Sequence, residues 1–363
     1  DNADAKEYLE KGSAMVKSMP IDEYSGLADK KDYVSEIEDL ELEDTTQLSE
    51  KQLLDQALLA EDAMLKNKKI TNSEGATRSF SKNTYNIINS KGFNAKYSKT
   101  FHSISSIAIA GSDTNMQRDY EYSAATHAGD LLLAEEVGSL AAKRAASRLN
   151  SKKIKSCTLD VIFEPRVAKS ILSSFCSCAS GTSIARGTSF LNNQLNTSIF
   201  KKNINITNNP KLKRGIGSAP YDSSGIKTEN ISIIQDGIFK NYFLNIRSAR
   251  QLRMAINGNS SPSNLILNKG DQDIETIIKN IKNGFLVTEM LGMSFNPING
   301  DYSRGATGFK IENGEITYPV SEVTIAGNLA EMLKNLIPAN DLKINDNINS
   351  PSILIEGMTL AGL

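Results

Sequence analysis

The sequence has few residues of the kinds that bind metals or form disulfides. It contains two histidines, three cysteines and no tryptophan in 363 residues. An odd and sparse set of cysteines cannot form a disulfide framework, so we expect a cytoplasmic protein. No apolar run approaches the roughly 18 to 20 residues that cross a bilayer, and the N-terminus has no signal-peptide pattern. We therefore expect no membrane span.

Neither sign of charge dominates the sequence. Its 41 basic and 42 acidic residues leave a formal net charge of -1. A protein that binds a phosphate backbone usually has a basic surplus, so we expect no direct contact with nucleic acid. The hydrophobic fraction of 39% is typical of a folded globular protein, and the length suits two domains.

Helical periodicity is clearest in three segments of the first part. Residues 5–16 have apolar side chains on one helical face, and Ser49 and Gln52 have the spacing of a capping box before a helix that ends near residue 65. A third helix is predicted over 135–149, and we interpret Lys143, Arg144 and Arg148 as cations that favour its C-terminal end. We expect the capped helix to bury Leu53, Leu54, Ala57, Leu58, Met64 and Leu65.

Strand patterns fill the remainder of the chain. Alternating residues over 75–127 predict consecutive antiparallel strands, and 158–163 is a short strand with buried character. Asp236-Gly237 and Asn313-Gly314 predict tight hairpins. Further helices are expected over 167–179, 248–256, 274–281 and 327–337.

These elements predict an α+β fold with two domains. We expect an N-terminal α/β domain over 1–153, with antiparallel strands and helices, and a C-terminal domain over 154–363. The C-terminal domain is expected to be strand-rich, barrel-like and antiparallel, with interleaved helices.

No complete catalytic motif occurs in the sequence. His102 lies in a strand-like run and His127 precedes Gly129, and neither belongs to an H-E-x-x-H or H-E-x-x-x-H arrangement. Cys176 and Cys178 point about 200° apart on a helix, so we expect them to pack in the core. Paired carboxylates remain an alternative at strand ends, although the sequence cannot pair Asp160, Glu164, Asp222, Glu289, Asp301, Glu322 and Glu356.

The densest pattern in the sequence lies near residue 300. It begins with Gly-Phe-Leu-Val-Thr-Glu-Met-Leu-Gly-Met at 284–293 and continues with Asn-Gly-Asp-Tyr-Ser-Arg-Gly-Ala at 299–306. Further blocks lie at 163–168, 186–191 and 351–358. Together they resemble the TldD/PmbA family, once called modulators of DNA gyrase. The likeness covers nearly the whole chain, but the N-terminal domain lacks the first segment that the family pattern leads us to expect.

Two departures from the family pattern affect the expected chemistry. The resemblance implies H-E-x-x-x-H on the helix at 167–179 and a Cys near the C-terminus in the TldD type of subunit. Ser173 and Ser174 stand at about the positions of the His and the Glu, and 340–349 contains no Cys. A hydroxyl replaces neither an imidazole ligand nor a carboxylate base. The chain therefore resembles the TldE/PmbA type, and we expect it to have no catalytic residue and to bind no metal.

The resemblance implies a heterodimeric zinc metallopeptidase that degrades unfolded peptides or small proteins. A TldD-type partner would hold the zinc, and this chain would close a shared cavity in which an extended peptide is held by strand addition. Asp301, Ser303, Arg304 and Gly305 are the candidates for lining that cavity or contacting the partner. The alternative for this loop is a structural turn that an Asp–Arg pair braces. A homodimer is compatible with the same surface.

Two other functions remain open from the sequence. The chain could be a self-sufficient peptidase with a site built from His127 and carboxylates. It could instead be a non-enzymatic binding or regulatory protein that acts on gyrase or a toxin, as the older family name suggests.

Overall fold

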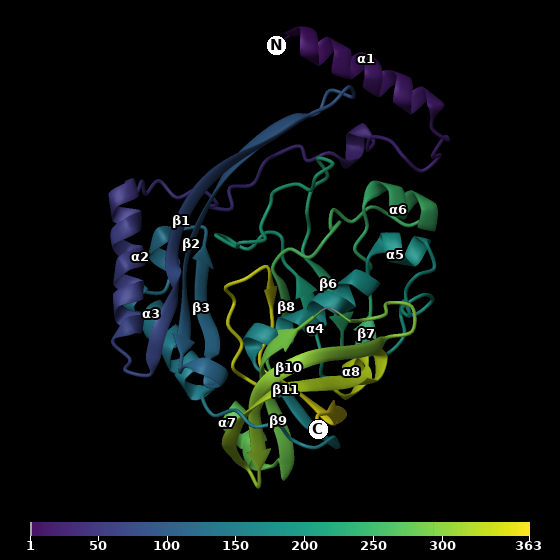
Figure 1. The fold of residues 1–363 in the computed structure, drawn as a ribbon. Coiled ribbons are helices and arrows are strands. Elements are labelled where there is room, and N and C mark those ends of the chain that lie inside the picture. The colour runs from purple at the N-terminus through teal and green to yellow at the C-terminus, as the bar shows by residue number, and fades with distance from the viewer. Residues whose placement is uncertain (1, 293) are drawn as a thin grey trace.

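The strands predicted over 75–127 form one antiparallel sheet in the computed structural model, which describes residues 2–292 and 294–363. The sheet has the order β1-β2-β3. The hairpin of β1 and β2 is long and extends as an arc beyond β3 (Figure 1). The elements of this half are α1 (Asn2–Ser18), α2 (Glu50–Leu65), β1 (Ile70–Ile88), β2 (Asn94–Ala110), β3 (Gln117–Ala125) and α3 (Ala134–Ser147).

Helices α2 and α3 cover one face of this sheet (Figure 1). The capping box of Ser49 and Gln52 is confirmed at the start of α2. Gly138 of α3 faces α2 so closely that an added Cβ would lie 1.9 Å from the carbonyl oxygen of Ala60. The absence of a side chain at Gly138 therefore sets the distance between the two helices.

The predicted buried face of α2 is wrong in part. Leu54 is 59% exposed, and Leu58 and Leu65 are also exposed, whereas Ala60, Ala63 and Met64 are buried. The close approach of α3 favours small residues at the contact, so the alanine face turns inward and the leucine face turns outward. Helix α1 forms as predicted, and its apolar side chains, including Leu9 and Val16, are exposed.

The second half contains a closed barrel. Strands β11, β10, β9, β4 and β14 pair in this order, and a further pairing between β11 and β14 closes the ring. Its pairs are antiparallel except for β4 and β9, which are parallel. The strands are β4 (Cys157–Phe163), β9 (Asn283–Leu291), β10 (Asp301–Glu312), β11 (Glu315–Asn328) and β14 (Ile353–Ala361), and β12 (Ile337–Pro338) adds to β14.

A second, smaller sheet and several helices surround this barrel. The sheet has the order β13-β8-β5-β6-β7. Both predicted hairpins are present, with Asp236-Gly237 and Asn313-Gly314 in the positive-φ conformation that such turns require. The elements are α4 (Pro165–Cys178), α5 (Gly181–Ala185), β5 (Ile206–Asn208), β6 (Ile231–Gln235), β7 (Ile238–Phe239), α6 (Ile246–Leu252), β8 (Leu265–Leu267), α7 (Ile274–Lys279), α8 (Leu329–Asn335) and β13 (Ile348–Asn349).

Helix α4 belongs to the largest hydrophobic core, which the barrel strands share. Ile171, Leu172 and Phe175 are fully buried, and Cys176 and Cys178 pack in the same core, as expected. The α+β class and the barrel-like C-terminal architecture are confirmed. Within the described residues, no helix is long and apolar enough to span a membrane.

The contact of Gly138 with α2 gives a stability prediction. We expect Gly138→Ala to lower the free energy of unfolding by about 1–3 kcal/mol, because the new methyl group must push the backbone of α2 away. Gly129→Ala is the matched control, since an added Cβ there meets nothing within 4 Å. Urea unfolding of both variants measures the difference. Equal stability of the two variants would contradict the packing argument.

Candidate functional site

Helix α4 has one polar face opposite its buried face. It begins directly after β4, with Glu164 at the N-cap and Pro165 in the first turn, where its missing N–H costs no hydrogen bond. The hydroxyl of Ser174 donates to the carbonyl of Ser170 at 3.0 Å, and that of Ser177 donates to Ser174 at 2.7 Å. Ser173 and Ser177 are exposed. The polar face therefore presents hydroxyl groups, among them those of Ser173 and Ser174.

The described residues offer no other metal site. Over 2–292 and 294–363, no group of three or more His, Cys, Asp and Glu side chains is placed to hold a metal ion. All three cysteines are free thiols. Burial raises the pKa of Cys178 to about 11, which disfavours the thiolate that a metal would need.

The expected loop at Asp301, Ser303, Arg304 and Gly305 is not a loop, because these residues form the start of β10 and pair with β11. This end of β10 lies beside α4. Asp301 and Ser303 line a groove of about 550 Å³ with Tyr302 and Ser294. The hydroxyl of Tyr302 lies 3.6 Å from the sulfur of Met290, and the same sulfur lies 3.7 Å from the hydroxyl of Ser170. Tyr302 and Met290 thus connect the start of β10 to the first half of the helix.

The Asp–Arg pair of the alternative interpretation is not among the contacts within the described residues. The carboxylate of Asp301 accepts a hydrogen bond from Asn299 at 2.7 Å, and Arg304 donates to the carbonyl of Gly292 at 2.9 Å. An added Cβ at Gly305 would lie 3.2 Å from the Leu291 side chain, so this strand position is tight. Met293 of the signature lies outside the described residues.

A buried ion-pair network joins the two halves of the chain. Arg148, at the end of α3, is 2% exposed and contacts Asp119 of β3 at 3.4 Å and Glu289 of β9 at 2.6 Å. Arg166 of α4 contacts Asp119 at 3.0 Å and Glu164 at 2.6 Å. Burial opposes the charge of Arg166, but Glu164 and Asp119 outweigh it and raise its pKa. The network fixes β3 against α4 and β9.

Arg144 and the two arginines of this network close part of the outer edge of β3. Arg148 donates to the carbonyl of Arg118, and Arg144 and Arg166 both donate to the carbonyl of Tyr120. The carboxylates of Asp119 and Glu121 accept the N–H groups of residues 120 and 122. Charged side chains therefore form hydrogen bonds with the backbone N–H and C=O groups of β3 that point away from β2.

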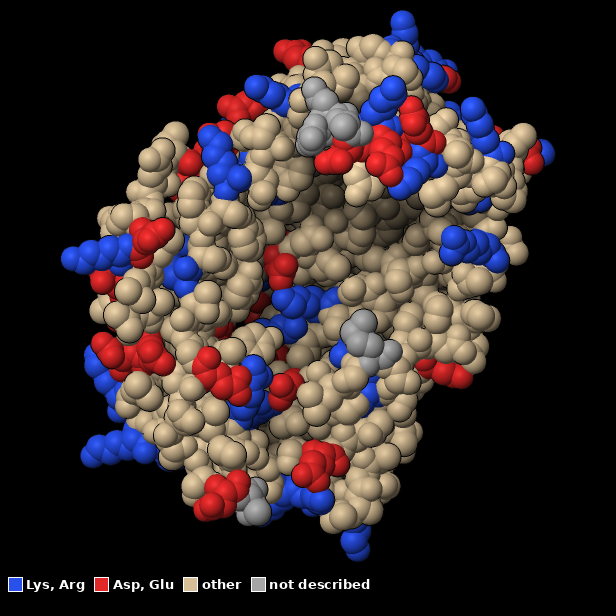
Figure 2. All heavy atoms as spheres, turned by 45° about the horizontal axis from the view of Figure 1, so that its top comes forward, with Lys and Arg blue, Asp and Glu red and all other residues tan. Residues whose placement is uncertain are grey.

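A cavity of about 400 Å³ lies next to the part of β3 that follows the blocked edge. Ala124 and Ala125 form one wall, and the loops at 212–216 and 344–346 form the others. Asp346 in the second loop accepts a hydrogen bond from Lys169 of α4 at 2.5 Å. Figure 2 shows the molecule hollowed on the face beneath the hairpin arc, with basic side chains gathered near the middle of the hollow.

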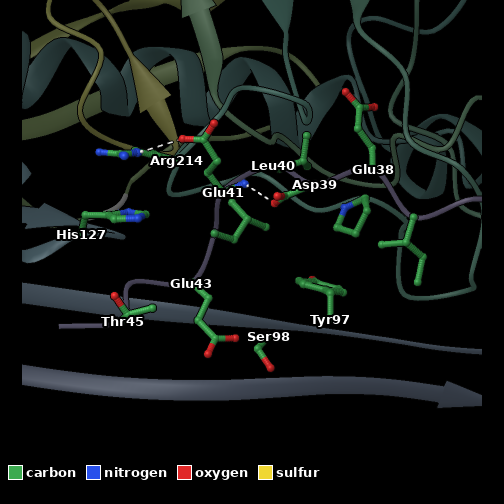
Figure 3. Close-up of a pocket in the computed structure, with 13 residues that line it drawn as sticks. Glu38, Asp39, Leu40, Glu41, Glu43, Thr45, Tyr97, Ser98, His127 and Arg214 are labelled. Atoms are coloured by element: carbon green, nitrogen blue, oxygen red, sulfur yellow. Dashed lines mark hydrogen bonds and ion pairs between the residues drawn. The ribbon is translucent and has the colours of Figure 1, made fainter. Parts of the chain in front are cut away.

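His127 lies at a different pocket of about 530 Å³. Figure 3 shows it with Arg214, Glu41, Glu43 and Thr45, and the acidic side chains come from the segment at 38–45. The ion pair of Arg214 and Glu41 measures 3.3 Å. The structure thus places His127 among charged and hydroxyl side chains from other segments, and not on the polar face of α4.

His102 lies fully buried beside this pocket. Its Nδ1 is 3.3 Å from Arg78, and its Nε2 is 3.4 Å from Asp44, without a hydrogen bond. Burial opposes ionisation of Asp44, but the N–H groups of Ala128 and Thr46 outweigh it and lower its pKa to about 2. Burial and the charge of Arg78 lower the pKa of His102. His102 is therefore a neutral core residue at neutral pH.

Of the carboxylates that the sequence could not pair, Glu164 and Glu289 share the arginine network. The others lie apart. Asp160 accepts the N–H of Gly357, Asp222 accepts loop N–H groups, and Glu322 pairs with Lys153. Sequence reasoning missed Arg148, which it interpreted as a helix-end cation. The family-like blocks at 163–168 and 284–293 contain Glu164, Arg166 and Glu289. They were the feature of the sequence that could have indicated this network.

Comparisons with known proteins match this architecture. The family models described as the PmbA/TldA metallopeptidase central domain and C-terminal domain match residues 29–149 and 156–362. The Escherichia coli O157:H7 metalloprotease PmbA is 37% identical over 344 residues, which cover 94% of this chain and 76% of that protein. A PmbA homologue of Buchnera aphidicola subsp. Baizongia pistaciae is 35% identical over 347 residues, covering 94% and 78%.

Solved structures have the same fold. A candidate modulator of DNA gyrase from Bacteroides thetaiotaomicron superposes with a TM-score of 0.92 at 28% identity, covering 100% of this chain and 84% of that chain. TldE from Thermococcus kodakarensis gives a TM-score of 0.84 at 21% identity, covering 100% and 85%. The fold and the matched domains define a chain of the metallopeptidase class. It belongs to the PmbA/TldD family, which confirms the resemblance found in the sequence.

The buried network gives a second stability prediction. We expect Arg148→Leu to lower the free energy of unfolding by about 3–5 kcal/mol, because it leaves Glu289 without its cation and removes one of the two cations that contact Asp119. Arg118→Leu is the control, since its pair with Glu74 is exposed and worth at most about 1 kcal/mol. Urea unfolding of the two variants measures both losses. Losses of equal size would contradict a structural role for the network.

His102 gives a prediction about pH. Its folded pKa lies below the unfolded value of about 6.5, so the unfolded chain binds the proton first as the pH falls. We expect this group to lower the free energy of unfolding below pH 6.5, by no more than about 1.4 kcal/mol per pH unit. His102→Gln should therefore show a flatter dependence of stability on pH between 7.5 and 5.5. Equal slopes for both proteins would contradict the assignment.

Proposed function

We propose that this chain is the TldE/PmbA-type subunit, without a catalytic metal site, of a heterodimeric zinc metallopeptidase. The observation that supports the proposal is the polar face of α4. Ser173 and Ser174 stand near the positions of the expected His and Glu, and the Ser174 hydroxyl is engaged with the helix backbone. A TldD-type partner would hold the zinc, which polarises a peptide carbonyl and activates water. We place the complex in the cytoplasm.

The groups near α4 suit contact with an extended peptide better than catalysis. The outer edge of β3 is closed as far as the N–H of Tyr122, whereas no hydrogen bond occupies the backbone of Ala124 within the described part of the chain. That residue lines the cavity next to Asp346, whose partner Lys169 lies one turn before Ser173. An unfolded peptide that pairs with Ala124 would therefore run toward the polar face of α4.

The start of β10, with Asp301, Ser303, Arg304 and Gly305, has a separate role in this proposal. Its groove lies on the barrel side of α4, and Asp301 is exposed. We assign this end of β10 to the wall of the shared cavity or to the partner contact. Because Arg304 is held by the backbone of Gly292, its guanidinium is positioned before any partner arrives.

The decisive experiment measures zinc content and cleavage of an unfolded peptide by this chain, by the TldD-type protein of the same organism, and by their mixture. We expect cleavage only in the mixture, with zinc bound by the partner. The partner with its metal-ligand histidines replaced is the matched control, and it should remove activity without preventing complex formation. Chelator-sensitive cleavage by this chain alone would instead favour the self-sufficient peptidase.

A regulatory binding protein is the second candidate. The similar Bacteroides thetaiotaomicron structure is described as a candidate modulator of DNA gyrase, which is the observation that favours this function. Binding of this chain to purified gyrase, measured without any TldD-type protein, would support it. Binding that requires the partner would show instead that the interaction belongs to the peptidase complex.

A further inference from the structure

A cavity of about 450 Å³ lies between the hairpin of β1 and β2 and two loops of the second half of the chain. The hairpin contributes Tyr85 and Tyr97 to its lining. The loop after residue 218 contributes Tyr221 and Asp222, and the segment at 260–263 adds serine hydroxyls. The cavity therefore combines three aromatic rings with one carboxylate.

The three tyrosines are held in place by their own contacts. The rings of Tyr85 and Tyr97 stack with their centroids 5.0 Å apart, and Tyr221 meets Tyr97 edge-on at 5.1 Å. The hydroxyl of Tyr221 lies within hydrogen-bond distance of two hairpin carbonyls, at 3.0 and 3.3 Å. An added Cβ at Gly225 would lie 2.4 Å from the ring of Phe93, so the loop lies directly on the hairpin. The cavity is thus formed before any ligand arrives.

Asp222 is the charged group of this cavity. Its Oδ1 accepts the N–H groups of Ser224 at 2.8 Å and Ile226 at 3.0 Å, whereas its Oδ2 has no hydrogen-bond or ion-pair partner over 2–292 and 294–363. No Lys or Arg is among the residues that line the cavity. Burial raises the pKa of Asp222, although the two N–H groups oppose this shift. A partly buried carboxylate without a cation gains from a ligand that supplies one.

This lining suits a basic side chain better than the other classes of ligand. The aliphatic stem of Arg or Lys can pack against the tyrosine rings while its charged end reaches Asp222. A cation near a tyrosine ring gains further from the charge distribution of the ring, and serine hydroxyls can accept its remaining N–H groups. An anion would meet Asp222 without a compensating cation, and an apolar side chain would bury this carboxylate without a partner.

The cavity also lies along the hollow that the proposed function assigns to the peptide. Tyr97 lines the pocket of His127 as well, and Arg214 lines both that pocket and the cavity at Ala124. Figure 3 shows His127 and Tyr97 on opposite sides of the middle pocket. Ala124 pairs with Ser103, which follows Tyr97 along β2 at a distance of roughly 20 Å. About six residues of extended peptide therefore reach from Ala124 to the tyrosines.

We propose that this cavity binds a basic side chain, Arg or Lys, of the unfolded peptide. Asp222 is its counter-ion, and Tyr85 and Tyr97 contact its stem. The inference rests on the proposed function, because the peptide is the same one. It adds that this chain selects peptides by a positive charge that lies away from the residue at Ala124.

The test measures binding of a peptide to this chain alone. The probe is an unfolded peptide of about twelve residues with blocked termini, a single arginine and one tryptophan, which spans both cavities. This chain contains no tryptophan, so the fluorescence anisotropy of the peptide reports binding without a label. Replacing the arginine by citrulline keeps its shape and removes its charge, and should weaken binding about tenfold. A lysine peptide should bind more tightly than the citrulline peptide.

Asp222→Asn tests the counter-ion. It removes the charge but keeps an oxygen for the N–H groups of Ser224 and Ile226. We expect the arginine peptide to bind about tenfold more weakly to this variant, whereas the citrulline peptide should bind as before. Asp236→Asn is the matched control, because it removes the same charge from an exposed hairpin turn that asparagine also adopts. Circular dichroism confirms that both variants are folded.

Tyr85 tests the aromatic wall. Tyr85→Leu removes the ring and should weaken binding of the arginine peptide about threefold. Tyr85→Phe keeps the ring and should bind this peptide as the parent chain does. Tyr85 is suited to this test because it is 46% exposed, so its replacement leaves the buried core intact.

Three outcomes would overturn the proposal: no binding of the arginine peptide, equal binding of the arginine and citrulline peptides, or equal binding of the arginine peptide to Asp222→Asn and Asp236→Asn. Its failure can be distinguished from that of the proposed function, because these titrations contain neither zinc nor a TldD-type protein. Cleavage by the mixture without a preference for arginine would contradict the tyrosine cavity alone. A preference for arginine without cleavage by the mixture would contradict the peptidase alone.

Discussion

The contact of Arg148 and Arg166 with Asp119 is the interaction on which the arrangement of the molecule depends. Asp119 belongs to the N-terminal sheet, and the two arginines connect it to α3, α4 and β9. Such a network stabilises only when every charge is paired, because each buried ion loses its hydration. The geometry of both halves must therefore be correct together. The position of the polar face of α4 relative to the sheet is one consequence.

The same network also determines where the sheet can accept another strand. Its arginines donate to the carbonyls of β3, so one set of side chains both joins the halves and closes an edge. The closure ends at residue 122, beside the cavity at Ala124.

Local patterns in the sequence predicted the elements well. Asp236-Gly237 and Asn313-Gly314 adopt the positive-φ turns that their residue types favour, and Ser49 and Gln52 cap α2. These features depend on neighbours within a few residues, so the sequence contains all that they need. The division into domains at 153 and 154 stays a prediction.

Features that depend on distant residues could not be predicted in the same way. The leucine periodicity of α2 indicated a buried face, but the close contact of Ala60 with Gly138 turned that face outward. Arg148 has the position of a helix-end cation, and only the fold brings Glu289, which is 141 residues away, to its side. A side chain's local position does not reveal a partner that long-range folding supplies.

The position of α4 is set by its buried face, and its chemistry is set by the opposite face. Ile171, Leu172 and Phe175 fix the helix in the core, whereas Ser173 and Ser177 contribute little to that packing because they are exposed. Residues on the polar face can therefore differ between members of the family without a cost to the fold. A likeness of fold then says nothing about which chain holds the metal. In the proposed function the residue types on that face decide it, because serine hydroxyls do not bind zinc as imidazoles do.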